Sequence, residues 1–115
     1  MIEFANERVV SFSLEYQDVF WEVRPTTEDL QQYEFFVQRS ESEAGPWKVI
    51  AGPLVDRYYV RDNGVPMITT NARTLFYRIR ALHVPSGREL YSVTVDREGV
   101  PNLLAQEMIR RERIL

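Results

Sequence analysis

The chain has 115 residues, of which 44% are hydrophobic and 27% charged, and this composition is typical of one globular domain that buries its own core. A formal net charge of −3 argues against sequence-independent nucleic-acid binding, which needs a basic face. The absence of cysteine excludes disulfides, thiolate metal sites and cysteine nucleophiles.

Residues 1–8 lack both a basic start and an apolar run, so we predict no signal peptide. No stretch of about 20 apolar residues is present, so we also expect no membrane span. These features predict a protein that stays in the cytoplasm, or that is assembled there into a larger particle such as a virion.

Apolar and polar residues alternate in a series of short segments. Residues 9–14 and 19–23 each predict a half-buried strand, and the polar stretch at residues 26–29 predicts a loop. Residues 33–37 predict a third strand, with Phe36 on the side opposite to its other aromatic residues. Alternation of this kind favours antiparallel sheets with one solvated face.

The same pattern continues in the second half of the chain. Residues 47–51 predict a fourth strand that follows a turn rich in glycine and proline, and residues 58–60 predict a short fifth one. The strongest strand is expected at residues 75–84, and a tight turn at residues 85–87 joins it to a hairpin partner at residues 90–95. Seven short strands at this spacing indicate a sandwich or a barrel.

The end of the chain changes character. Asn102 can cap a helix, and the residues that follow it are good helix formers. We therefore expect a β-domain over residues 1–100 and a helical tail over residues 101–115. A helix this short is marginal alone, and arginines are favoured at interfaces. The interface candidates are Leu104, Met108, Arg110, Arg111, Arg113, Ile114 and Leu115.

Several segments together resemble the fibronectin type III pattern across roughly residues 9–95. They are Trp21, Tyr33–Val37, Gly45–Trp47, Asp62–Val65 and Tyr77–Ala81. The resemblance implies an all-β fold, a seven-stranded antiparallel sandwich, here followed by the short C-terminal helix. Two departures affect the crossover before the sixth strand. Leu75 stands where the family usually has a tyrosine, and residues 67–73 look like an insertion.

Few residues suggest a catalytic or metal-binding role. His83 is the only histidine, and a catalytic base would need a nucleophile and an orienting carboxylate beside it. We interpret it as a surface loop histidine. The acidic pairs Glu28–Asp29 and Glu41–Glu43 lack the glycine-punctuated spacing of a calcium loop and are interpreted as solvated loop charges. No glycine pattern matches a phosphate loop. We therefore predict no catalytic, cofactor or metal site.

The large aromatic and basic residues have structural interpretations too. Trp21 and Trp47 could form a sugar-stacking platform, but the resemblance implies that both are core residues. Arg78 and Arg80 alternate outward on the strongest strand and, with Arg39, could form a basic stripe. Arginine stems that cover a sheet face are the plainer interpretation.

The sequence thus predicts a non-catalytic interaction module whose partners are other protein subunits, further copies of itself included, with no direct nucleic-acid or membrane contact. Domains that resemble it occur in the neck, tail or baseplate of bacteriophage virions. The alternative is a carbohydrate- or surface-binding accessory module of a bacterial protein, which a solvent-facing cluster of Phe36, Tyr58 and Tyr59 would favour. An enzyme would require a cleft that holds His83 beside a carboxylate.

Overall fold

The structure is a computed structural model that describes residues 2–4, 10–12, 17–24, 27–62 and 75–96. Its strands are antiparallel, so the all-β prediction is confirmed. The predicted C-terminal helix, its seven interface candidates and the predicted insertion lie outside the described residues. Within the described part of the chain, no helix has the length and apolar character needed to cross a membrane.

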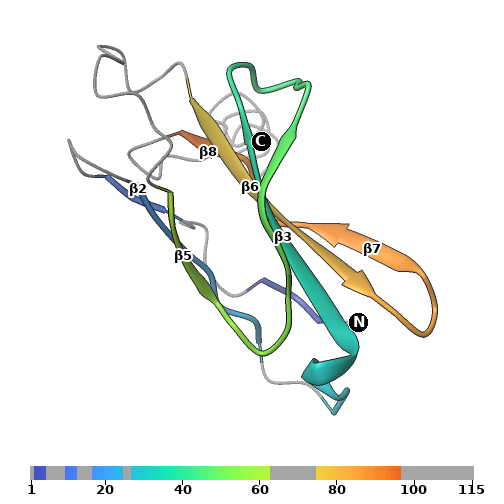
Figure 1. Cartoon of the computed structure of the whole chain (residues 1–115). Coiled ribbons are helices and arrows are strands. Elements are labelled where there is room, and N and C mark those ends of the chain that lie inside the picture. Colours follow the sequence, from blue (N-terminus) through green and yellow to red (C-terminus); the bar gives the residue numbers. More distant parts are fainter. Residues whose placement is uncertain (1, 5–9, 13–16, 25–26, 63–74, 97–115) are drawn as a thin grey trace, which may run out of the picture.

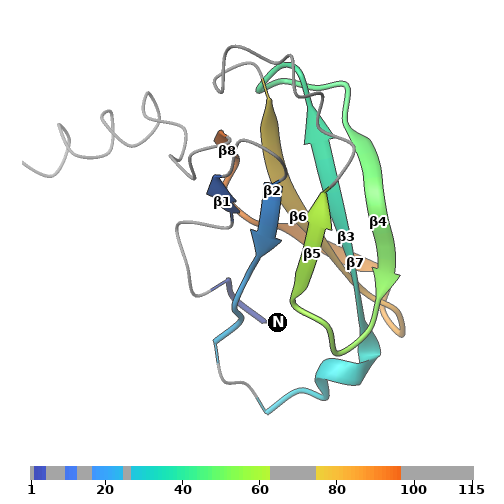
Figure 2. The ribbon, with the colours of Figure 1, turned by 60° about the vertical axis from the view of Figure 1, so that its left-hand side comes forward.

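The strands form two sheets, seen as separate layers in Figures 1 and 2. The elements are β1 (Val10–Phe12), β2 (Gln17–Phe20), the 3-10 turn η1 (Leu30–Gln32), β3 (Tyr33–Ser40), β4 (Lys48–Leu54), β5 (Tyr59–Asp62), β6 (Phe76–His83), β7 (Arg88–Tyr91) and β8 (Val95–Asp96). One sheet has the order β1-β2-β5. The other has the order β4-β3-β6-β7, with β8 also paired to β6.

The core lies between the sheets. Trp21, which follows β2, packs its ring against Phe35 of β3 with centroids 5.8 Å apart. The residues predicted to face inward on β3 and β6 are all buried, while Phe36 lies on the opposite side, as predicted. These inward residues are Tyr33, Phe35, Val37, Leu75, Tyr77, Ile79 and Ala81.

The fourth strand departs from the expected alternation. Trp47 was expected in the core, and strict alternation would put Val49 and Ala51 on the same side of the strand, but Trp47 is only half-buried and Val49 is 46% exposed. The register explains this correction: Ala51 pairs with Val37, whereas Val49 pairs with Gln38, its neighbour on the other side of β3. The shift between the two pairs inserts one residue, so side chains two apart on β4 face opposite sides.

A similar irregularity separates β7 from β8. Both strands pair with the same edge of β6, and the register slips by one residue between Arg80↔Tyr91 and Tyr77↔Val95. Ser92 lies at the slip and is buried. Its N–H donates to the Ile79 carbonyl at 2.9 Å, and its Oγ accepts the Ile79 N–H at 2.7 Å. A serine hydroxyl thus replaces the backbone acceptor that the bulge removes.

Replacing Ser92 with alanine should leave the buried Ile79 N–H without an acceptor. We expect the free energy of unfolding to fall by about 1–3 kcal/mol, the cost of an unsatisfied buried donor. Urea denaturation measures this change. The control is Ser42→Ala, because the Ser42 hydroxyl accepts the Ala44 N–H at an exposed turn and its loss should cost less than about 0.5 kcal/mol. Equal effects of the two substitutions would contradict the role assigned to Ser92.

A buried ion pair joins the two sheets. Asp62, at the end of β5, accepts a hydrogen bond from Arg39 Nη1 of β3 at 2.7 Å and one from the Tyr77 hydroxyl of β6 at 2.9 Å. The Asp62 side chain is 6% exposed and that of Arg39 17%. Arg39 therefore lies on the inner side of its sheet, and the basic stripe suggested for Arg39, Arg78 and Arg80 does not form.

Candidate functional sites

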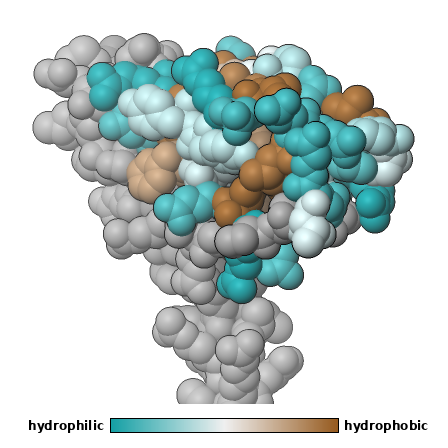
Figure 3. Space-filling view, turned by 90° about the horizontal axis from the view of Figure 1, so that it is seen from below, coloured by the Kyte–Doolittle hydropathy of each residue, from teal (hydrophilic) through white to brown (hydrophobic). Residues whose placement is uncertain are grey.

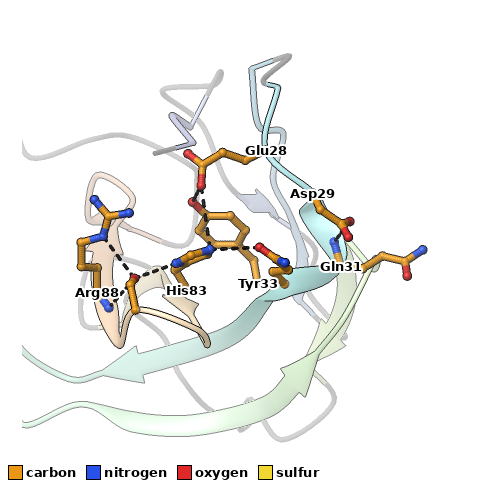
Figure 4. Close-up of polar contacts among 8 residues, drawn as sticks. Glu28, Asp29, Gln31, Tyr33, His83 and Arg88 are labelled. Carbon is orange, nitrogen blue, oxygen red and sulfur yellow. Dashed lines mark hydrogen bonds and ion pairs between the residues drawn. The ribbon is translucent and has the colours of Figure 1, made fainter.

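The first candidate site surrounds His83, where β6 ends beside η1 (Figure 4). His83 Nδ1 lies 2.6 Å from Ser86 Oγ, and its Nε2 lies 3.3 Å from Gln32 Oε1 and 3.9 Å from Glu28 Oε2. The Tyr33 hydroxyl donates to the same carboxylate oxygen of Glu28 at 2.7 Å. A serine and an imidazole from the end of β6 and its turn are thus brought together with a carboxylate from the loop before η1.

The donors around Ser86 fix where the protons lie. Its Oγ accepts the backbone N–H of Arg88 at 3.2 Å and the Nε–H of Arg88 at 3.1 Å, so both of its lone pairs are used. The Ser86 hydroxyl proton then points to His83 Nδ1. In a neutral ring, Nε2 carries the hydrogen and donates toward Gln32 and Glu28.

This arrangement corrects two sequence interpretations. His83 is a buried residue, 9% exposed, and its ring lies 4.9 Å from that of Tyr33. Glu28 is half-buried and hydrogen-bonded instead of a solvated loop charge. Burial raises the pKa of the Tyr33 hydroxyl, and its hydrogen bond to the Glu28 carboxylate raises it further. Tyr33 therefore keeps its proton and holds Glu28 against the end of the sheet.

The chemistry of this first site is limited by the same contacts. A nucleophilic serine needs a lone pair directed at substrate, and both lone pairs of Ser86 are occupied within its own turn. The network instead ties the β6–β7 turn and the loop before η1 to the sheet. Within the described ranges, no three or more histidine, aspartate and glutamate side chains gather as metal ligands.

The second candidate site is the outer face of the five-stranded sheet, the side turned away from the core. The guanidinium of Arg78 lies between two aromatic rings, 4.3 Å from the centroid of Trp47 and 4.2 Å from that of Tyr91. Arg78 Nε donates to Gln38 Oε1 at 2.7 Å. Gln38 of β3, Tyr91 of β7 and Trp47, the residue before β4, thus hold this arginine of β6 from three directions.

The neighbouring row on this outer face also places an arginine on an aromatic ring. Arg80 lies over the ring of Phe36 at 4.8 Å and forms an ion pair with Glu89. The hydrogen bond from Arg80 lowers the pKa of the Glu89 carboxyl group and raises that of Arg80 itself. The prediction that Arg78 and Arg80 face outward is confirmed, and their guanidinium groups lie on aromatic rings.

Trp47 belongs to this second site. Its expected burial in the core is wrong, whereas that of Trp21 is confirmed. The three aromatic residues proposed as a ligand-binding cluster do not gather either. Phe36 lies under Arg80 on the outer face, Tyr58 packs against Phe35 and Trp21 in the core, and Tyr59 donates to Asp18 on the smaller sheet.

Charges on the outer face are unevenly paired. Arg80, in the neighbouring row of this face, pairs with a carboxylate. Three arginines elsewhere in the described residues do so too: Arg24, Arg39 and Arg61. Arg78 makes no ion pair with a described residue. Glu34 of β3, which lies on the same outer face of the sheet as Arg78, makes none either. The end of the molecule seen in Figure 3 carries hydrophobic side chains as separate patches among hydrophilic ones.

Comparison with known proteins adds no assignment: no family model matches the chain, and no curated protein or solved structure matches it.

Proposed function

We propose that this chain is a non-catalytic interaction module of a multi-subunit assembly, and that it binds a neighbouring polypeptide through the outer face of its five-stranded sheet. The observation that carries the proposal is the Trp47–Arg78–Tyr91 stack. Aromatic residues and arginine are the types most enriched at the centre of protein interfaces. Here they are held in one conformation before any partner arrives, which lowers the entropy lost on binding.

The exposed apolar side chains on this outer face add to the proposal. Tyr91, itself part of the stack, is 44% exposed, and Val49, which pairs with Gln38 beside the stack, is 46% exposed. Each strand at the edge of the sheet also has backbone groups able to pair, although the register shifts of β4 make it a poor template. We therefore propose that the partner contacts the side chains of the outer face more than the backbone of the edge strands.

The fold we propose for this module is a fibronectin type III-like sandwich. What supports it is the strand order: with β7 and β8 taken as one interrupted strand, three strands stand opposite four. The assembly we propose is the neck, tail or baseplate of a bacteriophage virion, on the sequence resemblance alone. A carbohydrate-binding module is less well supported, because Arg78 fills the space between the two aromatic rings where a sugar would stack.

The test of this function is the size of the protein in cells that naturally contain it. A tagged chain should elute from size exclusion well above its own mass of 13.6 kDa. Val49→Glu should shift it to that mass, because a carboxylate placed in the interface is desolvated without a partner. The matched control is Val84→Glu, which adds the same charge to a valine that is 53% exposed beyond the end of β6. A wild-type chain that elutes alone, or a control that dissociates equally, would contradict the proposal.

A further inference from the structure

We infer that the outer face binds a second copy of this chain, as a two-fold symmetric dimer in which Arg78 of each copy pairs with Glu34 of the other. This inference rests on the function proposed above and names its partner. It is carried by two groups of opposite charge on one face of the same sheet that form no ion pair with any described residue.

The cation of the pair is Arg78. Its planar guanidinium is immobilised between Trp47 and Tyr91, and only Nε is used, in the hydrogen bond to Gln38. Its two terminal nitrogens, Nη1 and Nη2, bond to no described residue, which leaves one edge of the planar group for an acceptor. A carboxylate fits that edge with two parallel hydrogen bonds.

The anion of the pair is Glu34. It lies between Tyr33 and Phe35, which both point into the core with no exposed surface, so Glu34 points to the outer face. Its strand partner is Leu82 on β6, and its carboxylate makes no ion pair within the described residues. It is half-buried, so an ion pair formed there would be shielded from solvent more than one at a fully exposed position.

The spacing of the two groups suits a two-fold axis. Arg78 pairs with Gln38, four positions along β3 from Glu34, so the two side chains stand ~13 Å apart along the strand direction. Along the strand direction, the row formed by Phe36 and its partner Arg80 lies midway between them. An axis that passes over Phe36 in the plane between two facing sheets places each Arg78 above the Glu34 of the other copy. Both ion pairs then form at once, as a self-complementary interface requires.

Charge favours a second copy over a polyanion. Among the described residues of the face, one cation and one carboxylate make no ion pair, and their charges cancel when two copies meet. For a nucleic acid or a phosphate-rich surface, the two arginines of the face, Arg78 and Arg80, are offset by the carboxylates of Glu34 and Glu89. The exposed Val49 and Tyr91 flank the ion pairs and would be covered in the same dimer.

Sedimentation of the purified full chain over a range of concentrations tests the inference. The wild type should sediment as a dimer that dissociates on dilution and at high salt. Arg78→Glu and Glu34→Arg should each weaken dimerisation by about tenfold or more, because every substitution breaks both symmetric ion pairs. The double variant, with the charges exchanged, should dimerise more tightly than either single variant, since the pairing of opposite charges is restored.

Two controls separate pairing from folding and from net charge. Glu22→Arg makes the same change of charge at an exposed residue beside Trp21, away from the outer face, and should leave the dimer intact. Glu34→Gln keeps the shape of the side chain, so it reports on the ion pair even where Arg78→Glu disturbs the aromatic stack. A thermal melt of each variant shows whether it is folded.

The results that overturn the inference differ from those that overturn the proposed function. A wild-type chain that is monomeric up to about 0.5 mM, or a double variant that dimerises no better than either single variant, rules out the Arg78–Glu34 dimer. If that monomer still elutes in a large assembly from its own cells, and Val49→Glu releases it, the interaction module remains and its partner is a different protein.

Discussion

Replacing Asp62 with alanine should lower the free energy of unfolding by about 3–5 kcal/mol, a large part of the stability of a domain this size. The substitution removes the carboxylate that accepts from both the Arg39 guanidinium and the Tyr77 hydroxyl in the space between the sheets. A charge that has lost its partner in a buried position is more costly than the pair was favourable. Urea or guanidinium denaturation, followed by fluorescence, measures the loss.

The matched control for Asp62→Ala is Tyr77→Phe. It removes only the hydroxyl that donates to Asp62 and leaves the ion pair with Arg39, so we expect a loss of about 1 kcal/mol. A cost for Asp62→Ala no greater than that of the control would mean that solvent reaches Arg39 in the folded protein. The ion pair would then not be an element that holds the two sheets together.

Replacing Gly52 with alanine should cost about 3 kcal/mol, because both space and backbone oppose a side chain there. Gly52 has a φ of +126°, and a Cβ built on it would lie 2.7 Å from the Phe35 carbonyl oxygen and 2.8 Å from the Phe36 ring. The Phe35 oxygen belongs to the central strand β3 and cannot move aside without disturbing the sheet. Thermal denaturation should show a lower melting temperature with the same two-state shape.

Gly87→Ala separates the two causes. Gly87 also has a positive φ, +72°, but nothing lies within 4 Å of a Cβ built there. Its substitution should therefore cost only the backbone preference, about 1 kcal/mol. If the two glycine variants were equally stable, the close approach of β4 to β3 at Gly52 would add nothing to the cost of a side chain there. That result would contradict tight packing at the β4 bulge.

The sequence determined which side chains face the core on the two central strands. Side chains alternate along any strand, so the apolar residues at 33, 35 and 37 and at 75, 77, 79 and 81 needed no knowledge of their partners. The same alternation could have predicted that Arg39 lies on the inner side of β3. It shares its side of β3 with Val37, and so could not join Arg78 and Arg80.

Alternation did not predict which side chains face the core where a strand is irregular. The two sides of β4 exchange at a register shift, which placed Val49 on the outer face and left Trp47 beside Arg78. A bulge is decided by how a strand fits its neighbour, because the extra residue matters only relative to the opposite backbone. The turn residues Gly45 and Pro46 predicted where β4 begins but carried no information on its register.

Both candidate sites depended on contacts between distant parts of the chain. Gln32 and His83 are 51 residues apart, and Gln38 and Arg78 are 40 apart. Each of these residues is unremarkable in its local sequence. The β3–β6 register brings Gln38 to Arg78, whereas the two rings on Arg78 come from the segment before β4 and from β7. His83 gains Glu28 and Gln32 from the segment before β3, while Ser86 belongs to its own turn. The sequence determined the strands and their inward faces through local alternation, whereas pairing across the sheets alone decided which polar groups meet.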